Sequence, residues 1–83
     1  MVKDRIPKKL IEEWLVKLEK ELKKVKPVGE KGKEFLKNIQ AYIVDTKHFL
    51  KEGDYVKAWE LTSFAWGLFE GGEELGVLID FKK

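Results

Sequence analysis

The chain has 83 residues, enough for a single domain with one modest hydrophobic core, and we treat residues 1–83 as that domain. Hydrophobic residues make up 43% and charged residues 39% of the chain, a composition that excludes wholesale disorder. The absence of Cys excludes disulfides, Cys-ligated zinc and thiol catalysis, and no apolar run approaches the roughly 20 residues of a membrane span. The abundance of Lys and Glu is typical of thermophile proteins, and we expect a cytoplasmic protein.

Charge is unevenly distributed along the chain. Residues 1–33 contain 11 Lys and Arg and 6 Asp and Glu, a net charge of +5, whereas residues 34–83 contain 6 and 9, a net charge of −3. Two interpretations stay open: attraction between the two parts of the molecule, or a basic surface for RNA or an acidic partner.

The first predicted helix covers about residues 5–25. Asp4 is the expected N-cap, because its carboxylate can accept hydrogen bonds from the free amides of the first turn. Pro27 cannot continue the helix, because proline lacks an N–H group. Apolar residues recur at steps of four and three, which predicts a stripe that faces the core. They are Ile11, Leu15, Leu18, Leu22 and Val25.

The second and third predicted helices cover about residues 33–52 and 55–70. Gly53 suits the left-handed residue that ends a helix, and Asp54 suits the N-cap of the next one. Two residues between helices predict a tight antiparallel hairpin. Gly71 and Gly72 are expected to loosen or end the third helix.

The tail, residues 73–83, is apolar enough to dock on the helices. We expect a short helical turn, with an extended segment as the alternative, because Val77 to Phe81 is strand-like in composition. The elements together predict an all-α, antiparallel three-helix bundle with a short C-terminal helical or extended tail.

Residues 39–77 resemble a known family. The pattern begins with Tyr42, Asp45, Thr46 and the Phe-Leu pair at 49–50, continues with Gly-Asp-Tyr at 53–55, and ends with Phe-Ala-Trp-Gly at 64–67. It is similar to the short archaeal proteins that share domain of unknown function 357. The resemblance implies a small helical bundle and an archaeal, cytoplasmic origin, and it implies no activity.

Asp45 is the candidate for a partly covered carboxylate, because it lies between apolar residues of the second helix. A covered carboxylate needs hydrogen-bonding partners, so we expect a polar network of Asp45 with Tyr42, Tyr55 and Glu60. Its alternative role is ligand recognition in an aromatic-lined cleft. One His and scattered carboxylates favour neither a metal site nor a cofactor. HEPN nucleases, a class of helical RNA-cleaving proteins, carry an Arg followed by a His four to six residues later. The only Arg of this chain is Arg5, so that signature is absent.

Two groups of residues are candidates for partner binding. Three Trp are many for a chain of this size, and Trp14 is the one we expect to line an exposed interface. A basic region around the predicted loop is the best candidate for phosphate contacts. Its members are Lys23, Lys24, Lys26, Lys31 and Lys33.

We therefore expect a non-catalytic protein–protein interaction or assembly module, with an unidentified protein partner or a homodimer, and no membrane association. The first helix and the C-terminal segment are expected to carry its apolar and aromatic patch. The alternative is an RNA- or ribonucleoprotein-associated factor that uses the Lys23–Lys33 region.

Overall fold

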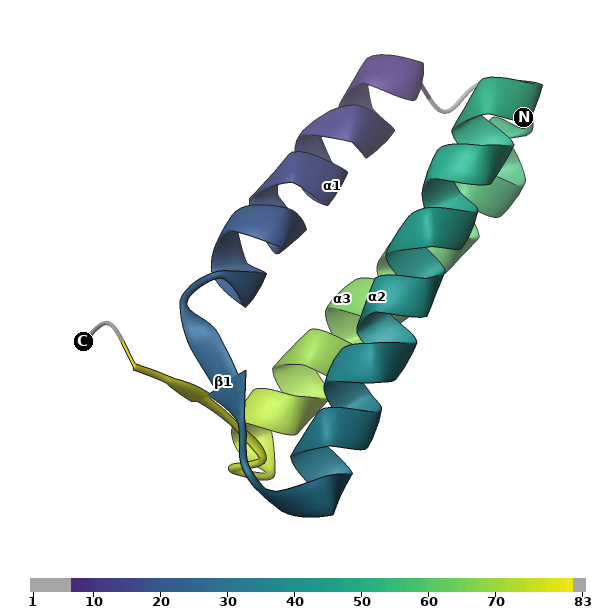
Figure 1. The fold of residues 1–83 in the computed structure, drawn as a ribbon. Coiled ribbons are helices and arrows are strands. Elements are labelled where there is room, and N and C mark those ends of the chain that lie inside the picture. The colour runs from purple at the N-terminus through teal and green to yellow at the C-terminus, as the bar shows by residue number, and fades with distance from the viewer. Residues whose placement is uncertain (1–6, 82–83) are drawn as a thin grey trace.

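A computed structural model, which describes residues 7–81, contains three helices and two short strands (Figure 1). In chain order these are α1 (Lys8–Leu22), β1 (Val25–Pro27), α2 (Gly29–Glu52), α3 (Tyr55–Glu74) and β2 (Leu78–Asp80). The long helices α2 and α3 lie side by side, α1 lies along them, and the strands cross one end of the bundle (Figure 1). The predicted three-helix fold with a short tail is confirmed.

The α2–α3 hairpin forms as its turn residues predict. Gly53 adopts a left-handed conformation with φ of 83° and caps the end of α2. Asp54 caps the start of α3, because its Oδ1 accepts a 3.0 Å hydrogen bond from the backbone N–H of Lys57. Both predicted caps are confirmed, whereas the predicted cap Asp4 lies outside the described residues.

The first helix is shorter than predicted at its C-terminal end. It stops at Leu22, and Val25 is a buried residue of β1. The residue before a proline is pushed toward extended geometry, so Pro27 acts on Lys26 and favours a strand there. The prediction that Val25 belongs to the helical stripe is wrong, although its side chain is buried as expected.

The other two helices are longer than predicted, since α2 begins at Gly29 and α3 continues to Glu74. Of the two predicted effects of Gly71 and Gly72, the end of the helix near residue 70 is wrong, and the reason is packing. A Cβ at Gly72 would collide with the side chains of Leu78 and Phe35, so this glycine lets β2 approach the helix.

Of the predicted tail, Glu73 and Glu74 continue α3, whereas Leu78–Asp80 is extended, which is the alternative that the sequence left open. β2 pairs antiparallel with β1, so that Val25 faces Asp80 and Pro27 faces Leu78. The N–H of Val28 also donates a 2.8 Å hydrogen bond to the carbonyl oxygen of Val77. These contacts join the end of α1 to the end of α3.

The hydrophobic core lies where the three helices and the strand pair meet. α1 contributes Ile11, Leu15 and Leu18, and an ion pair of 2.9 Å between Glu19 and Lys47 joins it to α2 at the surface. The remaining buried apolar side chains are Val25, Ile39, Ile43, Leu50, Ala58, Ala65, Phe69 and Leu78. Small alanines on α3 allow its backbone to lie close to α2.

Candidate functional site

Three indoles meet between α1 and α3. The ring of Trp14 contacts the rings of Trp59 and Trp66 edge to face, with centroid distances of 6.4 and 5.5 Å. The Nε1–H of Trp66 donates a 3.1 Å hydrogen bond to the carbonyl oxygen of Trp14. Trp14 nevertheless remains 37% exposed, so one part of its ring is fixed and another part faces solvent.

A groove of about 320 Å³ opens beside these indoles, and we call it the Trp14 groove. Its lining residues are Trp14, Trp59, Thr62, Ser63, Trp66, Gly67 and Glu70. Ser63 is exposed, whereas Thr62 is buried, so the polar groups that solvent can reach lie mainly at the rim. A hollow with aromatic walls and a polar rim can hold an apolar side chain from another molecule.

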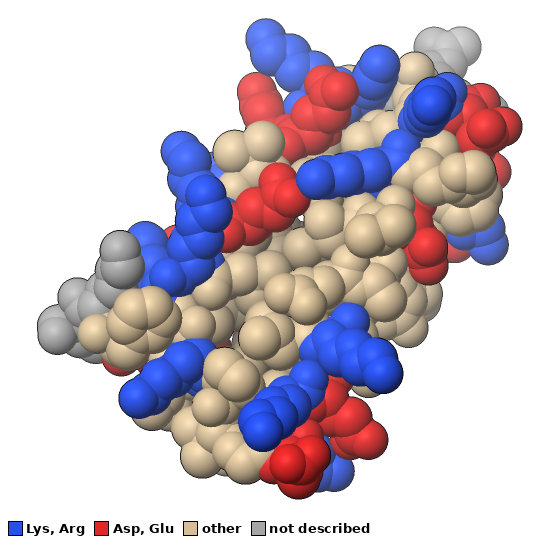
Figure 2. All heavy atoms as spheres, viewed as in Figure 1, with Lys and Arg blue, Asp and Glu red and all other residues tan. Residues whose placement is uncertain are grey.

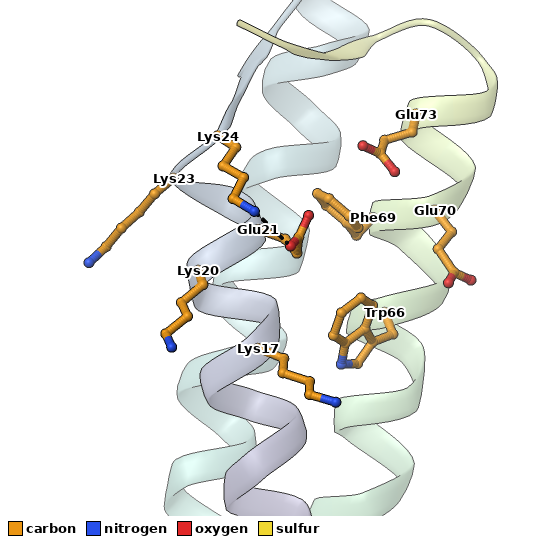
Figure 3. A pocket seen from close by; sticks show the side chains of 9 residues that line it. All are labelled: Lys17, Lys20, Glu21, Lys23, Lys24, Trp66, Phe69, Glu70 and Glu73. Carbon is orange, nitrogen blue, oxygen red and sulfur yellow. Dashed lines mark hydrogen bonds and ion pairs between the residues drawn. The ribbon is translucent and has the colours of Figure 1, made fainter. Parts of the chain in front are cut away.

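A larger groove of about 670 Å³ continues along α1 and α3, and it shares Trp66 and Glu70 with the first. Lysines from α1 border one side of it and Glu70 and Glu73 of α3 border the other (Figure 3). Lys17 points toward α3, with its Nζ 5.2 Å from the centre of the Trp14 ring, whereas Lys23 points away from the groove (Figure 3). The α1 side of the groove is therefore mainly positive, although Glu21 also lies there, paired with Lys24 at 3.2 Å, and the α3 side is negative.

The five lysines of the predicted basic region come from three successive elements of the chain. Lys23 and Lys24 lie at the end of α1, Lys26 lies in β1, and Lys31 and Lys33 lie in the first turns of α2. Two of them are paired with acidic residues. Lys24 contacts Glu21 at 3.2 Å and Lys33 contacts Glu30 at 3.7 Å. Figure 2 shows blue and red side chains interspersed along the upper edge of the molecule and again at its lower edge, with a largely uncharged band between them.

The predicted polar network around Asp45 is wrong. Asp45 is exposed and forms no hydrogen bond or ion pair with any residue in the range 7–81. Tyr42 and Tyr55 are half-buried by apolar neighbours. The carboxylate oxygen Oε1 of Glu60 lies 4.0 Å from Nζ of Lys57, on the same helix. Asp45 is therefore solvated and has no need of partners from the protein.

The buried polar contact lies one residue further along α2. Thr46 and Thr62 are almost fully buried, and the Thr62 hydroxyl lies 3.4 Å from Oγ1 of Thr46. Thr46 in turn donates a 2.8 Å hydrogen bond to the carbonyl oxygen of Tyr42. The signal for this pair was the place of each Thr within an apolar stripe, because a residue in such a stripe faces the core.

Sequence reasoning treated the three Trp separately and did not predict that they meet. The available signal was the seven-residue step from Trp59 to Trp66, which puts both indoles on one side of a helix. Their contact with Trp14 depends on where α1 crosses α3, which no local pattern specifies.

Within residues 7–81, His, Asp and Glu side chains form no group of three that could hold a metal ion. In the same part of the chain, none of the helices combines the length and the apolar character needed to cross a membrane. The exposed features that stand out are apolar and aromatic: a cluster of indoles, two grooves, and large side chains such as Phe64 on the surface of α3.

These features define a small three-helix protein with a strand pair across one end, and the comparisons identify its family. The chain belongs to the family described as protein of unknown function DUF357, whose model matches residues 10–78. It is similar to the crystal structure of protein AF1782 from Archaeoglobus fulgidus, which is assigned to the same family. The two are 34% identical, with a TM-score of 0.79, over 88% of this chain and 91% of that one. No protein with a curated description matches.

The resemblance predicted from residues 39–77 is thereby confirmed, and the family match is longer than predicted. It includes most of α1, which lies outside the residues on which the predicted resemblance rested.

Proposed function

We propose that this protein is a non-catalytic interaction module that binds a segment of another protein in the Trp14 groove. The proposal rests on the packing and exposure of Trp14. The rings of Trp59 and Trp66 hold its side chain in place, yet Trp14 remains 37% exposed. Trp residues dominate the binding energy of many interfaces, and a side chain that is already fixed loses little entropy when a partner covers it.

The charges around the grooves support an amphipathic helix as the partner segment. Its apolar side chains would enter the Trp14 groove, as in other complexes in which a helix lies in a hydrophobic groove. Its polar flanks would meet Lys17 and Lys20 on one wall and Glu70 and Glu73 on the other. Complementary charges of this kind fix the direction in which a partner helix lies.

The C-terminal segment offers a second apolar contact near the end of α1. Phe81 is 51% exposed, and its N–H donates a 2.9 Å hydrogen bond to the carbonyl oxygen of Lys24. Ile79 is 40% exposed. A partner segment long enough to reach the end of α1 would cover these side chains as well.

The test is a pull-down with the tagged protein from native cell lysate, divided into nuclease-treated and untreated halves. Trp14→Ala removes the anchor, and Ser63→Arg fills the groove without removing an indole. Val16→Ala is the matched control, because Val16 is an exposed apolar residue of α1 outside the groove. Circular dichroism of each variant checks that the helices remain folded.

We expect one set of proteins to survive nuclease treatment, to be retained by Val16→Ala, and to be lost with both groove variants. Capture that is the same with Trp14→Ala and Ser63→Arg as with the unchanged protein would contradict the proposal. So would a set of partners that disappears with nuclease.

The second candidate function is RNA binding, and the position of Lys17 over the Trp14 ring favours it. An aromatic ring beside a lysine can stack on a base while the ammonium group contacts a phosphate. The pairing of Lys24 and Lys33 with acidic residues weighs against the Lys23–Lys33 region as the main contact. Binding to single-stranded RNA that weakens steeply with salt, and that Lys17→Ala reduces, would support this alternative.

A further inference from the structure

α3 is apolar on its side away from α1 as well as on its core side. Trp59 and Trp66, which contact α1, occupy one flank of the helix. The opposite flank carries residues at steps of three, four, three and four, a spacing that keeps them in one stripe. They are Leu61, Phe64, Leu68, Gly71 and Leu75. None of these five residues is charged.

α2 continues this surface with three aromatic residues at steps of seven. Phe35, Tyr42 and Phe49 are half-buried, and the rings of Tyr42 and Phe64 lie 5.9 Å apart between centroids. The stripe of α3 and these three rings together form what we call the outer face. Its members are Phe35, Tyr42, Phe49, Leu61, Phe64, Leu68, Gly71 and Leu75.

The outer face is incompletely covered by the chain. Phe64 of α3 is 57% exposed, and Leu75, the residue directly after α3, is 67% exposed. Single exposed apolar residues are ordinary, but a contiguous apolar stripe marks an interaction surface. Asn38 and Asp45 are exposed polar residues of α2 beside it, as in the polar rim of an interface.

We propose that the outer face binds a second copy of this chain, so that two molecules form a two-fold symmetric dimer. In such a dimer each surface meets its own copy, so a contact surface must complement itself. An apolar stripe satisfies this condition, because it places no like charges opposite each other. Its steps of three and four residues are those of helices that interlock side by side.

The size of the outer face fits a reversible dimer. The stripe from Leu61 to Leu75 is about 21 Å long, because a helix rises about 1.5 Å per residue. Two packed helices present a face about 20 Å wide. Two such faces in contact remove roughly 800–1,000 Å² of surface, near the lower limit of specific interfaces. We therefore expect a dissociation constant in the micromolar range.

Gly71 supports close approach of a second helix. Nothing within the chain lies within 4 Å of the place that a Cβ would occupy there, so folding of the monomer does not require glycine. Glycine inside a helix is unfavourable relative to alanine. The open position leaves room for the backbone of a second helix to approach, as Gly67 leaves room beside the Trp14 groove.

The test is sedimentation velocity over a concentration range that spans the micromolar region. The unchanged protein should pass from monomer to dimer and form nothing larger, because a two-fold contact closes on itself. Phe64→Glu and Leu75→Glu should each weaken the dimer by roughly a hundredfold, because each places two uncompensated carboxylates in one apolar contact. Both side chains are more than half exposed, so both variants should keep the helical content of the unchanged protein.

Val44→Glu is the matched control. Val44 is an apolar residue of α2 that is 65% exposed. It does not belong to the outer face but lines a groove between α1 and α2. Val44→Glu adds the same negative charge as Phe64→Glu and Leu75→Glu. It should leave the dissociation constant unchanged. A monomer at every concentration, an open series of oligomers, or a dimer that is weakened by Val44→Glu and not by Phe64→Glu would each overturn the proposal.

The dimer and the groove function can fail separately, because they use different surfaces. Trp14→Ala and Ser63→Arg should leave dimerisation unchanged, since neither residue belongs to the outer face. Phe64→Glu should leave capture of a groove partner unchanged.

Discussion

The indole N–H of Trp66 donates a 3.1 Å hydrogen bond to the main-chain carbonyl oxygen of Trp14, and this bond joins α3 to α1. The acceptor belongs to the backbone, so the contact fixes where α1 lies along α3 independently of the Trp14 side chain. The same contact holds the walls of the Trp14 groove together.

Trp66→Phe should therefore lower the stability by about 0.5–1.5 kcal/mol through loss of this hydrogen bond. For a domain of this size, 1 kcal/mol corresponds to a fall in Tm of about 4–8 °C. Trp59→Phe is the control, because it removes an indole that also meets Trp14 edge to face, and no hydrogen bond joins it to Trp14. Equal losses of Tm for the two variants would show that the hydrogen bond contributes nothing.

Gly32→Ala should destabilise the protein by about 1–3 kcal/mol, as overpacking of a tight contact does. A Cβ at this buried position would meet the carbonyl oxygen of Val77 and the backbone of Pro27, where α2 leaves the strand pair. Gly67→Ala is the matched change in α3, where nothing lies within 4 Å, and it should stabilise by up to about 1 kcal/mol. Thermal unfolding of the two variants should give shifts of opposite sign.

The buried threonines should respond unequally to removal of their hydroxyl groups. Thr46→Val removes a donor to the carbonyl oxygen of Tyr42 and leaves the Thr62 hydroxyl without its acceptor, so we expect a loss of about 1–3 kcal/mol. Thr62→Val leaves Thr46 bonded and should cost less than about 1 kcal/mol. Chemical unfolding of both variants and the double variant measures their coupling. Identical losses for the two single variants would contradict this order.

Asp54→Ala should lower the stability by about 1 kcal/mol, because it leaves the backbone N–H of Lys57 without its cap. Asp54→Asn should restore most of that loss, since an amide oxygen also accepts a hydrogen bond. Asp45→Ala is the control: it removes an exposed carboxylate without a partner in the described chain, and Tm should stay unchanged. A large loss for Asp45→Ala would restore the polar network that the structure contradicts.

Local chemistry explains the parts of the fold that could be predicted. The turn at Gly53 and Asp54 depends on backbone conformation and a side-chain cap within a few residues, and both were predictable. The stripe of Ile11, Leu15 and Leu18 was predictable for the same reason, because helical spacing alone brings these residues to one side.

Contacts between distant parts of the chain explain the errors. Gly72 looked like the end of a helix, because its close contact with Leu78 is visible only after the chain has folded back. Val25 fitted a helical stripe by spacing, but its partner Asp80 in β2 draws it into a strand. The exposure of Asp45 and the meeting of Trp14 with Trp66 likewise depend on the angles between helices, which no local pattern contains.

The strand pair also has a consequence for the order of folding. Val25 and Asp80 lie far apart in the sequence, so pairing them closes a loop that contains the whole α2–α3 hairpin. Closing a long loop is entropically unfavourable until the intervening chain is compact. We therefore expect the hairpin, with its two-residue turn, to form first and the strands to join last. By the same reasoning, we expect the strand pair to be the first contact to open when the protein begins to unfold.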